Sequence, residues 1–171
     1  MRKLLTFLVV SVTAFALQAN PEGYFMFAVH SPGELPSPES DIYGMRLSAI
    51  YGDCTRLNGF DLSLSGTVRE RINGLQVGIL FSLDGAEMNG LGIGCVNYVG
   101  GEFAGCHIGL WNHAFSGAGA QFGIVNTASY FAGFQCGLFN WADNLDGLQI
   151  GLSNVVADQA CPWLPILNIG W

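Results

Sequence analysis

A unit of eight residues recurs along this chain of 171 residues, and it constrains the fold more than any other feature. Residues 133–140 read Gly-Phe-Gln-Cys-Gly-Leu-Phe-Asn, residues 147–154 read Gly-Leu-Gln-Ile-Gly-Leu-Ser-Asn, and residues 105–112 read Gly-Cys-His-Ile-Gly-Leu-Trp-Asn. The full series of copies begins at residues 44, 59, 74, 90, 105, 119, 133 and 147, at intervals of 14 to 16 residues. A fixed period of this length is the signature of a repeat architecture.

Within each copy, polar and apolar residues alternate. We number every copy from its first glycine as position zero. Positions one, three and five are apolar, as in Leu148, Ile150 and Leu152, whereas position two is polar or glycine, as in Gln149. Alternation with a period of two predicts a β-strand with one apolar face. The two glycines that most copies carry would cost a helix about 2 kcal/mol per copy, which excludes the helical alternative.

Two topologies are compatible with these strands. Eight copies, an apolar stretch from Gly23 and a C-terminal one from Trp163 give ten candidate strands. We expect an all-β fold, an antiparallel meander of about 8–10 strands closed as a small barrel whose apolar positions face lipid. The alternative is a parallel β-solenoid with one repeat of 14–16 residues per coil, an apolar dry core and stacked asparagines. Turns of equal length favour the solenoid, and the apolar C-terminus favours the barrel.

Side-chain pairing across neighbouring strands favours the barrel. Antiparallel pairing about residue 143 sets the large Gln135 opposite the small Gly151, although stacked glutamines in a parallel sheet are also compatible with the pattern. Antiparallel pairing around a turn centred on residues 100–101 likewise places Cys95 opposite Cys106, which makes these two residues a candidate disulfide. In the parallel alternative these two residues lie about 13 Å apart.

The repeat glycines are predicted to be structural. Each copy carries a glycine at position zero, and most carry a second one at position four. The predicted structural glycines are Gly74, Gly78, Gly90, Gly94, Gly105, Gly109, Gly119, Gly123, Gly133, Gly137, Gly147 and Gly151.

The N-terminal sequence predicts export. Residues 1–3 read Met-Arg-Lys, residues 4–17 are mostly apolar, and Ala19 precedes a plausible cleavage site, as in a secretory signal peptide. The apolar run is shorter than the roughly 20 residues of a membrane-spanning helix. We therefore predict a signal peptide at 1–19 and a single β-repeat domain at 20–171, with repeats from about 42 to 160. The mature chain has four basic residues against thirteen acidic ones, a net charge of −9, which excludes a nucleic-acid-binding surface.

The repeats resemble a family of bacterial exported surface-repeat proteins built from tandem Gly-Leu-Gln-Ile-Gly-Leu-x-Asn units. The resemblance covers roughly residues 42–171. It is best in the copies at Gly133 and Gly147, whereas the copies at Gly44 and Gly59 have serine in place of the second glycine and lack the asparagine. The C-terminal Leu-Pro-Ile-Leu-Asn-Ile-Gly-Trp also resembles the aromatic ending of outer-membrane β-barrel proteins. The resemblance implies export and location in the outer membrane or at the cell surface, and it supplies no catalytic residues.

No pattern in the sequence predicts catalysis. His107, on the polar face with Gln76, Gln121 and Gln135, is the only candidate centre, and one histidine with amides falls short of a metal site. We predict no catalytic residue, cofactor or metal, and no enzymatic activity. The expected function is a structural repeat protein of the outer membrane or cell surface. The alternative is a secreted β-solenoid that binds or adheres through a repetitive face. Membrane lipid is an expected partner if the fold is a barrel. Nucleic acid is not an expected partner, and whether the chain associates with itself stays open.

Overall fold

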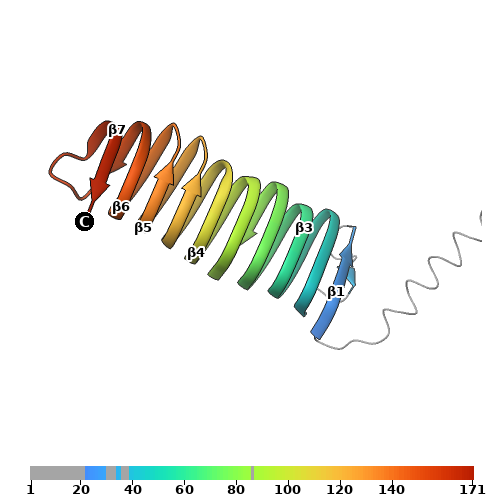
Figure 1. Cartoon of the computed structure of the whole chain (residues 1–171). Coiled ribbons are helices and arrows are strands. Elements are labelled where there is room, and N and C mark those ends of the chain that lie inside the picture. Colours follow the sequence, from blue (N-terminus) through green and yellow to red (C-terminus); the bar gives the residue numbers. More distant parts are fainter. Residues whose placement is uncertain (1–21, 30–33, 36–38, 86) are drawn as a thin grey trace, which may run out of the picture.

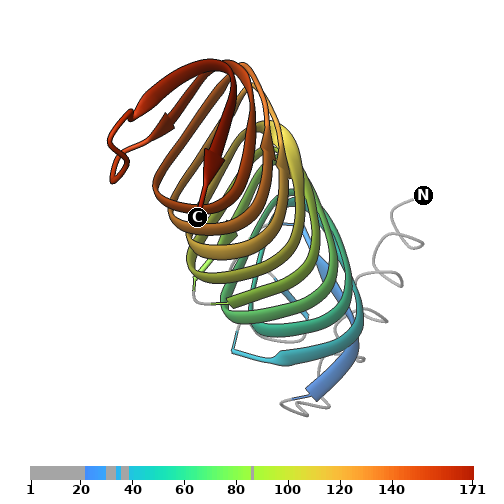
Figure 2. The ribbon, with the colours of Figure 1, turned by 60° about the vertical axis from the view of Figure 1, so that its left-hand side comes forward.

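The computed structural model describes residues 22–29, 34–35, 39–85 and 87–171, so the predicted signal peptide at 1–19 lies outside the described residues. The described chain winds into a stack of coils that together form one seven-stranded sheet (Figures 1 and 2). Its strands are β1 (Glu22–Ala28), β2 (Glu34–Leu35), β3 (Asp41–Asp84), β4 (Glu87–Phe122), β5 (Val125–Cys136), β6 (Phe139–Val156) and β7 (Trp163–Gly170). The spatial order is β2-β1-β3-β4-β5-β6-β7, and the long strands β3 and β4 pass through more than one coil (Figure 1).

The strands along the stack are parallel. The pairs β1–β3, β3–β4, β4–β5 and β5–β6 all run in the same direction, and only β2 and β7, at the two ends, pair antiparallel with their neighbours. Register follows the repeat, so that Gly133 pairs with Gly147 and Gln135 with Gln149. The predicted antiparallel barrel is therefore wrong, and the parallel β-solenoid with one repeat per coil is confirmed. Glutamines that stack on glutamines in this register replace the large-against-small pairing that had favoured the barrel.

The first glycine of each copy fixes the spacing between coils. All eight of these glycines have φ between 133° and 149°, a conformation that L side chains rarely adopt. A Cβ atom on Gly133 would lie 2.1 Å from the carbonyl oxygen of Gly119 in the preceding coil. The second glycines stack in the same way, since a Cβ on Gly137 would lie 2.4 Å from the carbonyl oxygen of Gly123. Both glycine columns thus mark places where neighbouring backbones touch.

The interior of the solenoid contains two kinds of column. The apolar column lies two residues before each first glycine and is filled by Ile42, Leu57, Ile72, Met88, Phe103, Phe131 and Leu145. Position nine adds smaller residues, including Val99, Ala114, Ala128, Ala142 and Val156. Between them lie the polar residues of position two, such as Gln121, Gln135 and Gln149, each with 0% of its surface exposed. The expectation that the apolar positions one, three and five would form the solenoid's dry core is therefore wrong, because these positions face outward.

Candidate interaction face

A ladder of buried asparagines holds neighbouring coils in register. The Nδ2 atom of Asn112 donates to the Oδ1 atom of Asn126 at 2.8 Å, and Asn126 donates in turn to Asn140 at 2.8 Å. Each of these amides also donates to a backbone carbonyl of the next coil, as Asn126 does to Cys136 at 3.0 Å. Asn97 and Asn154 are the two ends of the ladder. Because every rung joins identical residues, a shift of one residue would break all of the bonds at once.

The glutamines of position two form a second ladder, which ends at Gln121. Gln149 donates to Gln135 at 2.8 Å, and Gln135 donates to Gln121 at 2.7 Å. His107 occupies the same position one coil earlier, where its ring stacks on Phe103 with a centroid distance of 3.9 Å. Burial lowers the pKa of His107 to about 3, so the ring is neutral at physiological pH. A neutral ring with no exposed surface is a core residue of this stack.

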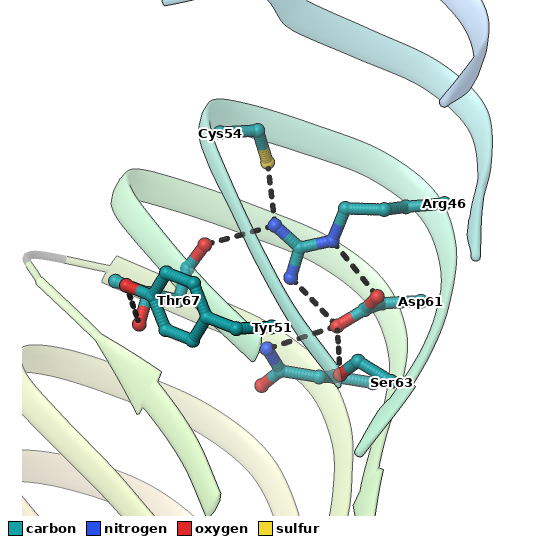
Figure 3. Close-up of polar contacts among 7 residues, drawn as sticks. Arg46, Tyr51, Cys54, Asp61, Ser63 and Thr67 are labelled. Carbon is teal, nitrogen blue, oxygen red and sulfur yellow. Dashed lines mark hydrogen bonds and ion pairs between the residues drawn. The ribbon is translucent and has the colours of Figure 1, made fainter. Parts of the chain in front are cut away.

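The polar column begins with an ion pair (Figure 3). Arg46 donates from Nε to Oδ1 of Asp61 at 2.8 Å and from Nη2 to Oδ2 at 2.7 Å, and both side chains are fully buried. The remaining nitrogen of Arg46 donates to the backbone carbonyl of Thr67 at 2.8 Å. Ser63 and Gln76 donate further hydrogen bonds to Asp61, each at 3.3 Å. With these partners the two charges replace amides at position two without breaking the column.

The cysteines do not form the predicted disulfide. Cys95 and Cys106 both carry free thiols, and they occupy positions five and one of adjacent coils. In the parallel register Gly105 stacks on Gly90 and Gly109 on Gly94, so four residues of offset, or about 13 Å, separate the two cysteines along the strands. Because the disulfide was predicted from antiparallel pairing of the strands, this prediction is wrong as well. Over the described residues, no group of three or more His, Cys, Asp or Glu side chains could hold a metal ion.

Positions one, three and five of the repeats form a continuous apolar surface, which we call the apolar face. β1 extends it at one end, where Phe25 pairs with Met45, and β7 extends it at the other, where Leu167 pairs with Ile150. The face contains no charged residue. Its repeat residues are Met45, Leu47, Ala49, Phe60, Leu62, Leu64, Leu75, Val77, Ile79, Leu91, Ile93, Cys95, Cys106, Ile108, Leu110, Ala120, Phe122, Ile124, Phe134, Cys136, Leu138, Leu148, Ile150 and Leu152, and none of them is buried.

The charged side chains of the ion pairs on the outside of the coils lie beyond this face, from position nine of one copy to the first glycine of the next. Arg56 is paired with Asp41 and Glu70, Arg69 with Asp53, and Arg71 with Glu87. Together with the buried Arg46, these are all four arginines of the chain after the predicted signal peptide, and each has a carboxylate partner.

A row of aromatic residues follows the apolar face around the coil, at positions six and eight. Trp111 and Trp141 are each 48% exposed, and Phe139 and Tyr98 are also exposed. These four residues therefore lie outside the core of the solenoid. We call this set the aromatic row.

The fold and the face together define a parallel β-solenoid with one uncharged outer surface along its whole length. The chain matches no family model, and no curated protein or solved structure proved significantly similar to it. In the part of the chain that the structure describes, no helix is long and apolar enough to span a membrane.

The sequence predicted which residues form the apolar face, but not that this face lies on the outside of the solenoid. The signal that places them outside was present two residues before each first glycine, where seven of the eight copies carry a large apolar residue. Those residues fill the interior, and alternation along the strand then directs positions one, three and five outward.

Proposed function

We propose that this chain is an exported, non-enzymatic structural protein of the cell surface, a stiff rod that acts by laying its apolar face against another surface. The observation that carries the proposal is the apolar face, an outer surface without a charge that extends from β1 to β7. Soluble monomers rarely expose contiguous apolar patches of more than a few hundred Å². A face of this extent is typical of a surface that is covered when the protein works.

The interior supports a structural role rather than catalysis. The polar groups with unusual chemistry, His107 and the pair of Arg46 and Asp61, are fully buried inside the coils. A substrate would have to open the stack to reach them. The signal-peptide pattern at 1–19 supports export, and the resemblance to exported surface-repeat proteins supports a location in the outer membrane or at the cell surface.

The aromatic row favours a second candidate function, a secreted binding or adhesion module. Exposed tryptophans such as Trp111 and Trp141 are the side chains that dominate many binding interfaces. In that case the aromatic row would contact a ligand and the apolar face would play no direct part.

Two lysine substitutions separate these functions. The full chain, with its leader, is expressed in a bacterial host, and cell fractionation measures how much protein associates with the cell envelope. We expect Ile108→Lys, at the centre of the apolar face, to release the protein into the soluble fraction, and Trp141→Lys, on the aromatic row, to leave its distribution unchanged. Both side chains point outward, so circular dichroism should show an unchanged β-sheet spectrum. Release by Trp141→Lys alone would favour the binding module, and retention of both variants would refute the proposed role of the apolar face.

A further inference from the structure

We infer that the apolar face is covered by the apolar face of a second copy of this chain, so that the protein is a face-to-face homodimer. The inference rests on the proposed function, because it names the surface against which the rod lies: the form held at the cell envelope would be the dimer, and Ile108→Lys would release the protein by separating the two copies. It is carried by the size of the face, by the position of the charges and by the pairing of the arginines.

The size of the face matches a stable dimer. The face comprises β1, the eight repeats and β7, which makes ten stacked rows of backbone, since β3 and β4 each contribute several rows. At about 4.8 Å between strands and about 3.3 Å per residue along them, the face measures roughly 43 Å by 16 Å, or about 700 Å². Two copies would then bury about 1,400 Å² in total, which lies within the range of about 1,200–2,000 Å² for stable protein interfaces.

The shape and chemistry of the face suit a sheet-on-sheet contact. Its side chains stand in three parallel columns on one sheet, and two such sheets pack with interdigitated side chains at about 10 Å, as in a β-sandwich. All three columns are apolar from end to end, so the contact would desolvate no charge. The acidic residues near the turns would stay at the solvated rim.

The same charges argue against a lipid surface as the occupant. Proteins that lie on anionic membranes use lysine and arginine on the polar side of the contact. After the predicted signal peptide this chain has no lysine, and its four arginines are each paired with a carboxylate. A net charge of −9 gives the protein no electrostatic attraction to an anionic membrane, and the packing of two uncharged faces needs none.

The mass of the purified protein in detergent-free buffer tests the dimer. We expect sedimentation equilibrium to give twice the mass of one chain for the wild type. Ile108→Lys places a charge at the centre of the interface in both copies, and we expect it to raise the dimer dissociation constant by at least about 100-fold. Phe115→Lys is the matched control, because Phe115 is 53% exposed, against 44% for Ile108, and lies outside the apolar face. It should leave the dissociation constant within about threefold of the wild type.

A vesicle experiment distinguishes failure of the dimer from failure of the proposed function. Phosphatidylcholine vesicles, alone or with phosphatidylglycerol, are sedimented with each protein. A monomeric wild type that binds vesicles, and loses binding on Ile108→Lys, would overturn the dimer but keep the apolar face as the docking surface. A monomeric wild type that binds neither kind of vesicle would overturn both. Equal dissociation constants for Ile108→Lys and the wild type would also overturn the dimer.

Discussion

Asn126, in the middle of the asparagine ladder, offers a direct test of what holds the coils together. Its side chain takes part in three hydrogen bonds: it accepts one from Asn112 and donates two, to Asn140 and to the carbonyl of Cys136. Replacement by alanine removes all three. We expect Asn126→Ala to be one of the most destabilising substitutions of a polar residue in the chain.

The magnitude follows from the partners that lose a bond. Asn112 keeps its bond to the carbonyl of Phe122, and the carbonyl of Cys136 keeps one from the backbone of Gly123. The Oδ1 atom of Asn140 loses the donor that Asn126 supplied. Three hydrogen bonds at a net value of about 1 kcal/mol each give about 3 kcal/mol, and the buried acceptor left without its donor adds about 1 kcal/mol or more, so the free energy of unfolding should fall by about 4 kcal/mol or more.

Two further variants calibrate this figure in urea denaturation followed by circular dichroism. Asn97 begins the ladder and makes two such bonds, to Asn112 and to the carbonyl of Ile108, so Asn97→Ala should cost about 1 kcal/mol less than Asn126→Ala. Asn89 is exposed and donates a single side-chain bond to Asn73 at 3.2 Å, so Asn89→Ala should cost about 0.5 kcal/mol or less. If Asn126→Ala costs no more than Asn89→Ala, the ladder does not stabilise the stack and the reasoning is refuted.

Three other substitutions test the remaining parts of the interior. Arg46→Met should cost about 3–5 kcal/mol in urea denaturation, because it leaves Asp61 buried without its cation. The double variant Arg46→Met/Asp61→Leu should recover most of that loss. A double variant as unstable as the single one would contradict this expectation. Folding lowers the pKa of His107 below its value in the unfolded chain, so the wild type should lose stability as the pH falls below about 6.5. Between pH 7 and pH 5 its free energy of unfolding should fall by about 2 kcal/mol more than that of His107→Gln. Parallel pH profiles of the two proteins would count against this. Gly133→Ala should cost more than about 3 kcal/mol, since its Cβ would meet a backbone oxygen at positive φ. Gly92→Ala should cost less, because its Cβ would meet side chains and no backbone, namely the ring of His107 at 2.8 Å and Cε of Met88 at 3.0 Å. Equal melting temperatures for the two variants would be inconsistent with the glycine stacking.

The sequence sufficed to predict the strands and their period, because both depend on local pattern. Alternation along residues 147–152 requires an extended chain in any topology, and the glycine at position zero marks the same place in every coil. The direction of neighbouring strands was not determined by this pattern. Antiparallel pairing would place Gln135 opposite Gly151, whereas the parallel pairing of the structure places it on Gln149, and the sequence pattern is compatible with both. What favours the parallel one is the hydrogen bond between the two amides, at 2.8 Å, which the sequence could not place.

The inside and the outside of the sheet were harder to assign than the strands. In a soluble solenoid the apolar side of an alternating strand is expected to be the core, yet here Gln149 is buried and Ile150 is 38% exposed. The reversal is possible because a buried amide costs little when an identical neighbour satisfies it. A single glutamine at position two would have no such neighbour, whereas Gln135 in the column donates to Gln121 and accepts from Gln149. The unit of stability is therefore the column, which no single copy of the repeat reveals.

This reversal links the interior of the rod to its surface. Amide ladders and a narrow apolar column already fill the interior, so the apolar residues of positions one, three and five are not needed there and contribute nothing to the core. Their uniform apolar character over eight copies then requires another cause, since exposed positions of a free rod would tolerate polar residues, and the turns between these strands do carry them. A contact along the whole length of the rod is such a cause, because it would keep every copy of the three positions apolar and leave the turns at its solvated rim. The regularity of the face is thus an argument for a partner as regular as the rod, and a second copy of the chain has that property.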